Sequence, residues 1–453
     1  MKKLWLVVAL VAWGGLAVNT FADVQNIRLS GDVRIRGYYL NGTDVNPNNG
    51  HNGLDEAFIS QRTRVSVEAD LEDHVLVVVT LKAEGDWGQS NDTSDSSGAG
   101  TANTGGSDDK INRSWDVGVT EAYVQFNELF YTAATLKLGR QYLHYGRGLI
   151  ISSVEQEYNY DAARLVLDYY PLTIDIVGAQ LVNNQSFGGA SSHAGSADLL
   201  FINGRYEMSD SAIKNIEMYF GWIAQGSSGP ITSTTVPPTV NSGSPMIIGA
   251  RADLNLAEPI NSFIEGAYEF GSDGTPNTDN LSAYIVNLGF RLTLKDTQWS
   301  PVFNFGNTIA SGGGNGNVSG VFVPWFDYLE GYNGYLFCPA LANIQIINAG
   351  ASIKPYENTT LSVQGYFYRK IDKDGPAGSN VNYDWGGPTW SAAASGVNSR
   401  ELGWEIDGIL GYDYSKDVRM QLVYGVFLPE NAYQNAGFSV AAQEVRAEVN
   451  VKF

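Results

Sequence analysis

Four arginines stand at alternating positions on two neighbouring segments near the start of the sequence. Arg34 and Arg36 lie in one segment, and Arg62 and Arg64 lie in the next. Residues two apart point to the same face of a β-strand, so each pair would share one side of a sheet. A guanidinium is permanently charged and offers a planar fork of donors to carboxylates. The spacing therefore predicts a ladder of anion-binding groups on one polar face.

The same alternation places further charged groups on that face. By parity it receives the arginines Arg251, Arg291, Arg419 and Arg446. It also receives the acids Asp32, Glu68, Asp70, Glu84, Asp86, Asp253, Glu265, Glu269, Glu405, Asp407, Asp413, Glu444 and Glu448. Glu84 and Asp86 come close to the arginine ladder and could neutralise it. Two interpretations stay open: the arginines bind anions, or they pair with acids of neighbouring strands and brace the wall.

The last ten residues, 444–453, show the alternation most clearly. Val445, Val449 and Phe453 share one face, whereas Glu444 and Glu448 share the other. A period of two is the signal of a β-strand. A strand with one apolar face and one charged face suits a barrel wall between lipid and water. The terminal aromatic residue resembles the ending that the barrel-assembly machinery reads in bacterial outer-membrane proteins.

The N-terminus predicts export. Lys2 and Lys3 precede an apolar stretch at 4–18, and Thr20 and Ala22 are small residues at the positions that a signal peptidase inspects. This pattern is typical of a secretory signal, which we place at 1–22. A membrane-anchoring helix is the alternative, although the stretch is short. Residues 23–453 then form one domain, because no linker divides them.

Composition narrows the fold class. Past the N-terminus, no segment reaches the ~20 consecutive apolar residues of a spanning helix. An exported chain that stays in a membrane must then be a closed barrel. The 51 glycines, 25 tyrosines and 10 tryptophans suit turns and interfacial girdles. We predict an all-β, antiparallel, up-and-down transmembrane β-barrel of about 18 strands, with roughly 16 as the competitor because 115–119 and 199–206 are ambiguous. The net charge of −20 excludes nucleic acid as a partner.

The connections alternate between short and long. Short ones are predicted at 72–73, 170–172, 295–300, 355–358 and 415–417. Long ones are predicted at 88–113, 183–197, 225–244, 271–279, 308–339, 371–400 and 429–440. Outer-membrane barrels have short periplasmic turns and long external loops. The pattern therefore predicts that the long connections face the outside of the cell.

Two segments carry a resemblance to a known family. They read TEAYVQF at 120–126 and LKLGRQYLHYGR at 136–147, and Asp161 to Leu165 follow as DAARL. This block is similar to the alginate-export family of outer-membrane porins, and the resemblance extends over 26–453. It implies an 18-stranded pore lined by arginines, with a segment folded inward after the second motif.

The resemblance also assigns Arg140, Arg147 and Arg164 to the pore lining. Arg140 has the outward parity of Leu136 and Leu138, so a kink at Gly139 would have to turn it inward. Together with the parity argument, the predicted pore-lining residues are Arg34, Arg36, Arg62, Arg64, Glu84, Asp86, Arg140, Arg147, Arg164, Arg251, Arg291 and Arg419.

The mixture of acids and arginines favours a passive channel for small hydrophilic or anionic solutes over a dedicated polyanion exporter. The expected setting is the outer membrane of a Gram-negative bacterium, with lipid and lipopolysaccharide around the barrel. The alternative is a structural barrel that sheaths a periplasmic or multihaem partner protein.

Enzymatic chemistry has little support in the sequence. The four histidines, His51, His74, His144 and His193, show no metal-ligand spacing. No Gly-x-Ser-x-Gly elbow is present, and we expect neither a catalytic residue nor a metal or other cofactor. The single cysteine, Cys338, cannot form an internal disulfide.

Overall fold

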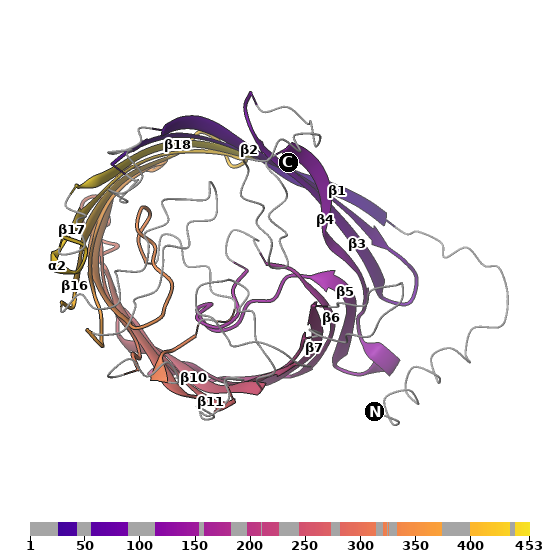
Figure 1. Ribbon diagram of the computed structural model, residues 1–453. Helices are drawn as coiled ribbons and strands as arrows, with labels where there is room; N and C mark the ends of the chain where they lie inside the picture. Colours follow the sequence, from indigo (N-terminus) through magenta and orange to yellow (C-terminus); the bar gives the residue numbers. More distant parts are fainter. Residues whose placement is uncertain are drawn as a thin grey trace, which may run out of the picture.

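Eighteen antiparallel strands pair in sequence order, and the first pairs with the last, so that the sheet closes into a barrel (Figure 1). The computed structural model describes residues 26–42, 56–88, 114–153, 158–182, 197–209, 211–225, 244–272, 281–313, 320–323, 325, 333–373, 399–434 and 440–453. The predicted fold class and strand number are confirmed. The two ambiguous regions, 115–119 and 199–206, form strands β4 and β8.

The strands have the following bounds: β1 Asn26–Asn41, β2 Glu56–Asp70, β3 Val75–Asp86, β4 Ser114–Phe126, β5 Ala134–Gln141, β6 Tyr160–Tyr169, β7 Leu172–Val182, β8 Ala197–Glu207, β9 Ile213–Gln225, β10 Ser244–Ala257, β11 Ile260–Ser272, β12 Leu281–Thr293, β13 Val302–Ala310, β14 Ile344–Tyr356, β15 Thr359–Arg369, β16 Glu401–Asp413, β17 Val418–Pro429 and β18 Ala442–Lys452. A 3-10 turn, η2 (Leu129–Tyr131), and a short helix, α2 (Asn431–Gln434), lie outside the sheet.

The C-terminal strand seals the barrel. In β18, Val449 lies opposite Ile35 of β1 and opposite Met420 of β17. Gly31 and Phe453 exchange two backbone hydrogen bonds of 2.9 and 3.0 Å beyond the last strand residue. Both backbone edges of β18 are therefore paired, which is what a membrane-spanning sheet requires because lipid offers no hydrogen-bond partners.

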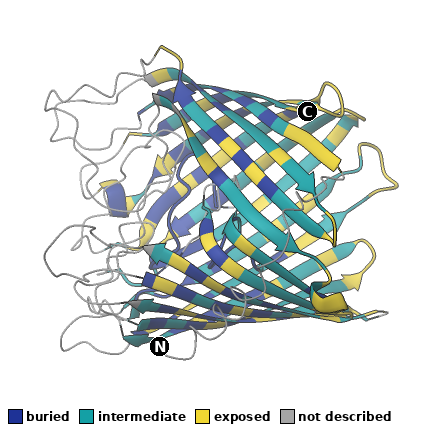
Figure 2. Ribbon diagram, turned by 90° about the vertical axis from the view of Figure 1, so that its right-hand side faces the viewer, coloured by how far each residue is buried: buried dark blue, intermediate teal, exposed yellow. Residues whose placement is uncertain are grey.

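The period-two pattern separates an inner and an outer face. In β1, Asp32, Arg34 and Arg36 are buried, whereas Ile27 and Leu29 are each 65% exposed. Figure 2 shows the same alternation of buried and exposed residues along the other strands. Because the exposed set is largely apolar and the buried set near β1 is charged, the outer face suits lipid and the inner face suits water.

Connections of two kinds lie at opposite ends of the barrel. Tight turns at 71–74, 170–171, 258–259, 357–358 and 414–417 join strands at one end, called here the short-turn end. The other end, called the long-connection end, receives the long connections. The predicted long connections at 88–113, 183–197, 225–244, 271–279 and 371–400 lie almost entirely outside the described residues, as does the predicted signal segment 1–22.

Two long connections fold into the barrel rather than away from it (Figure 1). The first inward segment, residues 142–153, joins β5 to β6. The second inward segment, residues 333–343, leads into β14 and contains the buried Cys338. Apolar side chains of both segments pack with the inner faces of β6–β17 in one cluster that includes Leu149, Phe201 and Phe337. This cluster occupies part of the barrel interior near the long-connection end. Among the described residues, no helix is long and apolar enough to cross a membrane.

Candidate functional site inside the barrel

Four arginines of β1 and β2 project together into the barrel interior and are called here the basic band: Arg34, Arg36, Arg62 and Arg64. Arg34 lies directly opposite Arg62 in the strand register. The side chains of Arg34, Arg36 and Arg62 are at most 6% exposed. Like charges directly opposite each other on a sheet are destabilising, so the band requires acids close by.

Carboxylates of β1, β3 and β18 interleave with the basic band. Arg36 bonds Glu448 at 2.5 Å, and Arg64 bonds Asp32 at 2.5 Å. Looser pairs of 3.6 Å join Arg62 to Asp32 and Arg34 to Glu84. Each arginine of the band thus has an acid within ion-pair distance, which is the arrangement expected of a cross-strand lattice that braces the wall.

The lattice continues on both sides of the basic band. Lys82 of β3 lies 3.5 Å from Glu84, and Asp86 beyond it is buried. In β18, Arg446 lies 3.5 Å from Glu444 and its guanidinium stacks 4.9 Å from the ring centre of Tyr335. Positive and negative groups therefore alternate over this inner wall instead of forming one continuous cationic surface.

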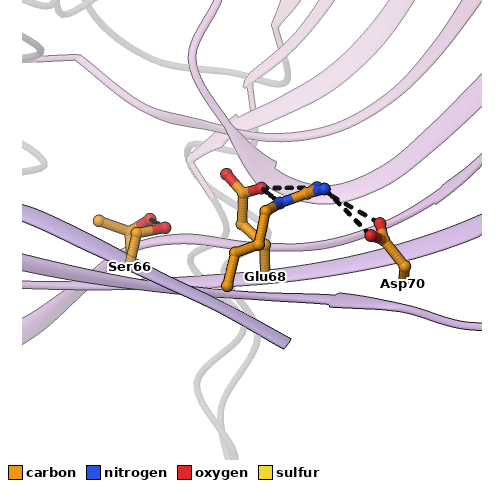
Figure 3. Close-up of polar contacts among 5 residues, drawn as sticks. Ser66, Glu68 and Asp70 are labelled. Carbon is orange, nitrogen blue, oxygen red and sulfur yellow. Dashed lines mark hydrogen bonds and ion pairs between the residues drawn. The ribbon is translucent and has the colours of Figure 1, made fainter. Parts of the chain in front are cut away.

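The charged groups at the short-turn end are more exposed. Arg28 of β1 lies between Glu68 and Asp70 of β2, at 2.9 and 3.0 Å, and its side chain is 51% exposed. Figure 3 shows how these two carboxylates hold one guanidinium. Arg419, a predicted pore-lining residue, pairs in the same way with Asp413 at 3.3 Å. Such pairs contribute little stability because water screens them.

The first inward segment is held by carboxylates of the barrel wall. The backbone N–H of Gly146 donates to Glu217, and that of Arg147 donates to Glu265 at 2.9 Å. Tyr219 donates a further hydrogen bond to Glu265. The guanidinium of Arg147 lies 3.9 Å from the ring centre of Phe263. Charge-assisted bonds to backbone N–H groups are stronger than neutral ones, so these acids fix the segment against β9 and β11.

Two side chains of the first inward segment are held uncharged. Burial lowers the pKa of His144, and the positive charges of Arg251 and Arg147 lower this pKa further. Neutral His144 accepts a hydrogen bond from the backbone N–H of Ser153 at 3.2 Å through Nδ1. Burial likewise raises the pKa of Tyr145. The fold of the segment therefore depends on a histidine that carries no proton on Nδ1.

A buried carboxylate of β16 anchors the second inward segment. Three consecutive backbone N–H groups, of Tyr335, Leu336 and Phe337, donate to Glu405 at 2.7 to 2.9 Å. Tyr368 adds its hydroxyl at 3.1 Å. Consecutive N–H groups that point into one concavity form an anion-binding nest. On β11, Glu269 accepts a hydrogen bond from the backbone N–H of Val323 at 2.9 Å.

These anchoring roles were not predicted. The parity argument placed Glu265, Glu269 and Glu405 on the inner face, where the structure also places them, but it suggested arginine partners. Their partners are backbone groups of segments that are distant in sequence. Glu217 was not singled out at all. No local pattern signals such contacts, because an N–H donor is present at every residue except proline.

The three arginines assigned by the family resemblance have different environments. Arg164 faces the interior and pairs with Asp175 at 2.6 Å. Arg147 lies within the interior on the first inward segment. Arg140 differs from its prediction: it pairs with Asp161 at 2.9 Å on the outward parity of β5 and β6. Gly139 has a positive φ of 123°, but this kink does not move Arg140 to the inner face.

A cavity of about 620 Å³ lies between the inward segments and the inner wall from β9 to β15. Arg147 and Asn333 of the two segments border one side. Arg251 borders it as well, paired with Asp253 at 2.7 Å. Arg291 lies at its edge, and within the described part of the chain no acid lies at ion-pair distance from this arginine. The cavity thus combines a lining of polar and apolar side chains with a guanidinium, that of Arg291, open to a solute.

Within the described ranges, no group of three or more histidine, cysteine, aspartate or glutamate side chains is arranged to hold a metal ion.

Comparison with known proteins agrees with this architecture. The model of a family described as alginate export matches residues 26–446. Curated proteins give no match. Three channels of Pseudomonas aeruginosa share the fold. OprD has a TM-score of 0.56 and 13% identity, and the alignment covers 97% of this chain and 98% of OprD.

The other two solved structures hold small carboxylates. OpdK, crystallised with vanillate, has a TM-score of 0.54 and 11% identity over 94% of this chain and 98% of its own. OccK2 (OpdF), in complex with glucuronate, has a TM-score of 0.53 and 9% identity over 95% and 97%. These identities show a common fold, whereas the family match covers nearly the whole described barrel. The chain therefore belongs to the alginate export family and is an 18-stranded outer-membrane β-barrel channel.

Proposed function

We propose that the protein is a passive channel for small hydrophilic solutes, anions among them. The observation that carries this proposal is the open cavity that the inward segments and the wall border, with amide, hydroxyl and guanidinium groups in its lining. A volume of this order matches ordinary small-molecule sites, which measure roughly 300–1,000 Å³. Both inward segments are anchored to the wall, so the cavity is a standing feature of the barrel and needs no partner to form.

Arg291 is the group through which we expect anions to be favoured. It borders the cavity and, within the described residues, has no acid at ion-pair distance. A carboxylate that enters the cavity can therefore pair with this guanidinium without displacing an existing partner. The small carboxylates named with OccK2 and OpdK, glucuronate and vanillate, are of a size that this proposal accommodates.

A dedicated polyanion exporter is a weaker interpretation of this interior. A long polyanion would need an uninterrupted row of available cations, because conduction requires many weak sites in succession. Here the basic band is interleaved with Asp32, Glu84 and Glu448. Paired arginines attract an anion less than open ones, so the band favours weak selectivity for small solutes.

The sheath alternative is also a weaker interpretation. A barrel that encloses a periplasmic or multihaem partner needs an open lumen along its whole length. In this barrel the chain's own side chains, among them Trp325, Phe337 and Leu149, pack into the interior near the long-connection end. That occupancy supports a restricted channel over a sheath.

Several features of the cellular setting complete the proposal. We infer that residues 1–22 are a cleaved signal segment, that the barrel-assembly machinery inserts the chain through its C-terminal strand, and that lipid and lipopolysaccharide surround the apolar outer face. We orient the long-connection end outward and the short turns toward the periplasm, as in other outer-membrane barrels.

Purified protein in a planar bilayer tests the proposal. We expect discrete conductance steps and a shift of the reversal potential in a salt gradient that indicates weak ion selectivity. In proteoliposomes, Arg291→Gln should slow the uptake of glucuronate and leave the uptake of methyl glucoside unchanged. A purified, folded barrel that conducts no ions in any lipid composition would contradict the channel function.

A further inference from the structure

The inner wall of β12–β15 differs in chemistry from the inner wall of β1–β3. Seven side chains on this wall carry an amide or a hydroxyl group and no charge, and they border the cavity together. They are called here the amide wall: Asn287, Asn304, Thr308, Asn348, Ser352, Ser362 and Gln364. The basic band and its acids lie on β1–β3 and β18. Arg291 of β12 lies opposite Asn304 in the strand register, so a solute on the amide wall meets dipoles, with this guanidinium at the edge.

Hydrogen bonds fix the amide groups in position. Asn304 and Gln364 exchange two reciprocal bonds of 2.9 and 3.3 Å across β14. Asn287 donates to Thr308 at 2.6 Å. An amide has four hydrogen-bonding positions, so Asn304 and Gln364 keep donors and acceptors that can be directed to a solute, whereas the amide oxygen of Asn287 is buried. The wall is thus preorganised and is not saturated by its internal bonds.

Glycines of neighbouring strands keep the amide wall flat. A Cβ at Gly306 would overlap the amide oxygen of Asn348, and a Cβ at Gly350 would overlap that of Gln364. The amides therefore lie across the glycines instead of extending into the lumen. Phe263 covers Gly289 in the same way beside them. A larger residue at these glycines would push the polar groups inward and reduce the cavity.

We propose that the amide wall is a binding subsite for the hydroxyl groups of an uncharged sugar ring in the pyranose form. Neighbouring hydroxyls of such a ring act as donor and acceptor at once, and an amide matches both roles with its carbonyl and its NH₂ group. The seven side chains of the amide wall carry no charge themselves, so binding to them needs no carboxylate, although Arg291 lies beside them. This inference rests on the proposed channel function and goes beyond it, because it assigns a solute class that Arg291 does not select.

Block of the ion current tests the subsite in the intact protein. Methyl glucoside is added to single open channels, and its dissociation constant is taken from the concentration dependence of the block. Asn304→Leu combined with Gln364→Met removes both partners of the reciprocal pair, so that neither amide is left unpaired. We expect this double variant to weaken the block by about tenfold, the effect of losing roughly two net hydrogen bonds.

Two controls separate the subsite from its surroundings. Ser66→Ala removes a hydrogen bond of 2.9 Å to Thr80 from the wall of β2 and β3, away from the cavity, and leaves Thr80 bonded to Glu121 at 3.0 Å. This variant should leave the block unchanged. Arg291→Gln should weaken block by glucuronate but not by methyl glucoside. Retained heat-modifiable gel migration and unchanged single-channel conductance identify correctly folded variants.

The outcomes are distinct from those of the proposed function. Channels that conduct ions but show no block by methyl glucoside in the unmodified protein overturn the subsite and leave the channel intact. Equal block in the unmodified protein and in the Asn304→Leu/Gln364→Met variant also overturns it. A protein without conductance instead contradicts the channel function itself.

Discussion

At the scale of single residues, the partner of each charged group decides what that group can do. Arg36 and Arg64 make short contacts with Glu448 and Asp32, so their charges are neutralised locally. Arg291, at the edge of the cavity, has no acid at ion-pair distance among the described residues. Two arginines with the same parity and the same inward direction can thus differ in function, and sequence periodicity cannot separate them.

Replacement of the basic band tests this difference. The combined substitution Arg34→Gln, Arg36→Gln, Arg62→Gln and Arg64→Gln leaves Asp32 and Glu448 without their cations and leaves Glu84 with Lys82 only. We expect the reversal potential in a potassium chloride gradient to move toward cation preference. The barrel should also lose stability, because breaking one buried ion pair costs about 3–5 kcal/mol, and the gel shift on heating should occur at a lower temperature.

Arg28→Gln serves as the matched control for the basic band. This arginine also pairs with two acids, but it is half exposed at the short-turn end, so its loss should change neither property measurably. If the fourfold variant keeps the ion preference of the unmodified channel, the basic band braces the wall and does not contribute to selectivity.

His144 gives the first inward segment a dependence on pH. Its folded pKa lies below the ordinary histidine value near 6.5. The stabilising contribution of neutral His144 is therefore fully present above that value and is lost as the pH falls through the lowered pKa. Protonation of Nδ1 removes the acceptor for Ser153, so we expect more frequent current fluctuations at acidic pH.

His144→Gln provides the comparison for this pH effect. A glutamine oxygen can accept the same hydrogen bond and does not titrate in this range. The variant should therefore show a number of current fluctuations that is independent of pH. Acid-induced fluctuations of equal size in both proteins would assign them to another group.

At the scale of elements, the strands could be predicted and the inward segments could not. A wall that separates lipid from water repeats with a period of two along every strand, so residues 444–453 or 26–41 reveal their faces without any partner. The inward segments instead depend on contacts between distant residues, such as those of Leu336 and Phe337 with Glu405. A carboxylate on an inward parity indicates its direction but not its partner, which is why Glu405 was grouped with the lattice acids.

Glu405→Gln tests how the second inward segment is held. The glutamine amide has one oxygen to accept hydrogen bonds from three backbone N–H groups. Its NH₂ group adds donors at a place where there is no acceptor for them. Bonds to charged groups contribute about 1.5–3 kcal/mol each, so the anchor weakens substantially. We expect a larger or less steady single-channel current as the segment leaves the wall.

Glu401→Gln is the control, because Glu401 is the first residue of β16 and bonds Asn431 rather than the segment. An unchanged current in Glu405→Gln would mean that the segment does not restrict the channel.

At the scale of the whole molecule, the barrel wall has lipid on its outer side and water on its inner side. The interior itself has two parts that differ in chemistry. Its outer face is apolar along the strands, and its inner face is charged or amide-rich where water can enter. Near the long-connection end, the interior instead becomes a packed apolar cluster that joins both inward segments to the wall. Apolar side chains therefore occupy both sides of this part of the sheet, but only those inside the barrel pack against protein.

Two phenylalanines, one inside the barrel and one on its outer face, allow the packing of the two sides to be compared. Phe337 is fully buried in the interior, with ring centres of Phe427 and Tyr368 at 4.5 and 4.8 Å. Phe305 lies in β13 with 44% exposure on the outer face. Phe337→Ala should destabilise the barrel by about 3–5 kcal/mol, as expected when a buried aromatic side chain leaves a cavity, and should widen the restricted part of the channel. Phe305→Ala should destabilise the barrel less, because lipid tails can fill the space that the ring vacates.

The measurements are the temperature of the heat-induced gel shift and the single-channel conductance. Equal losses of stability in the two variants would contradict a packed interior, since they would imply that Phe337 is no better packed than a side chain in contact with lipid.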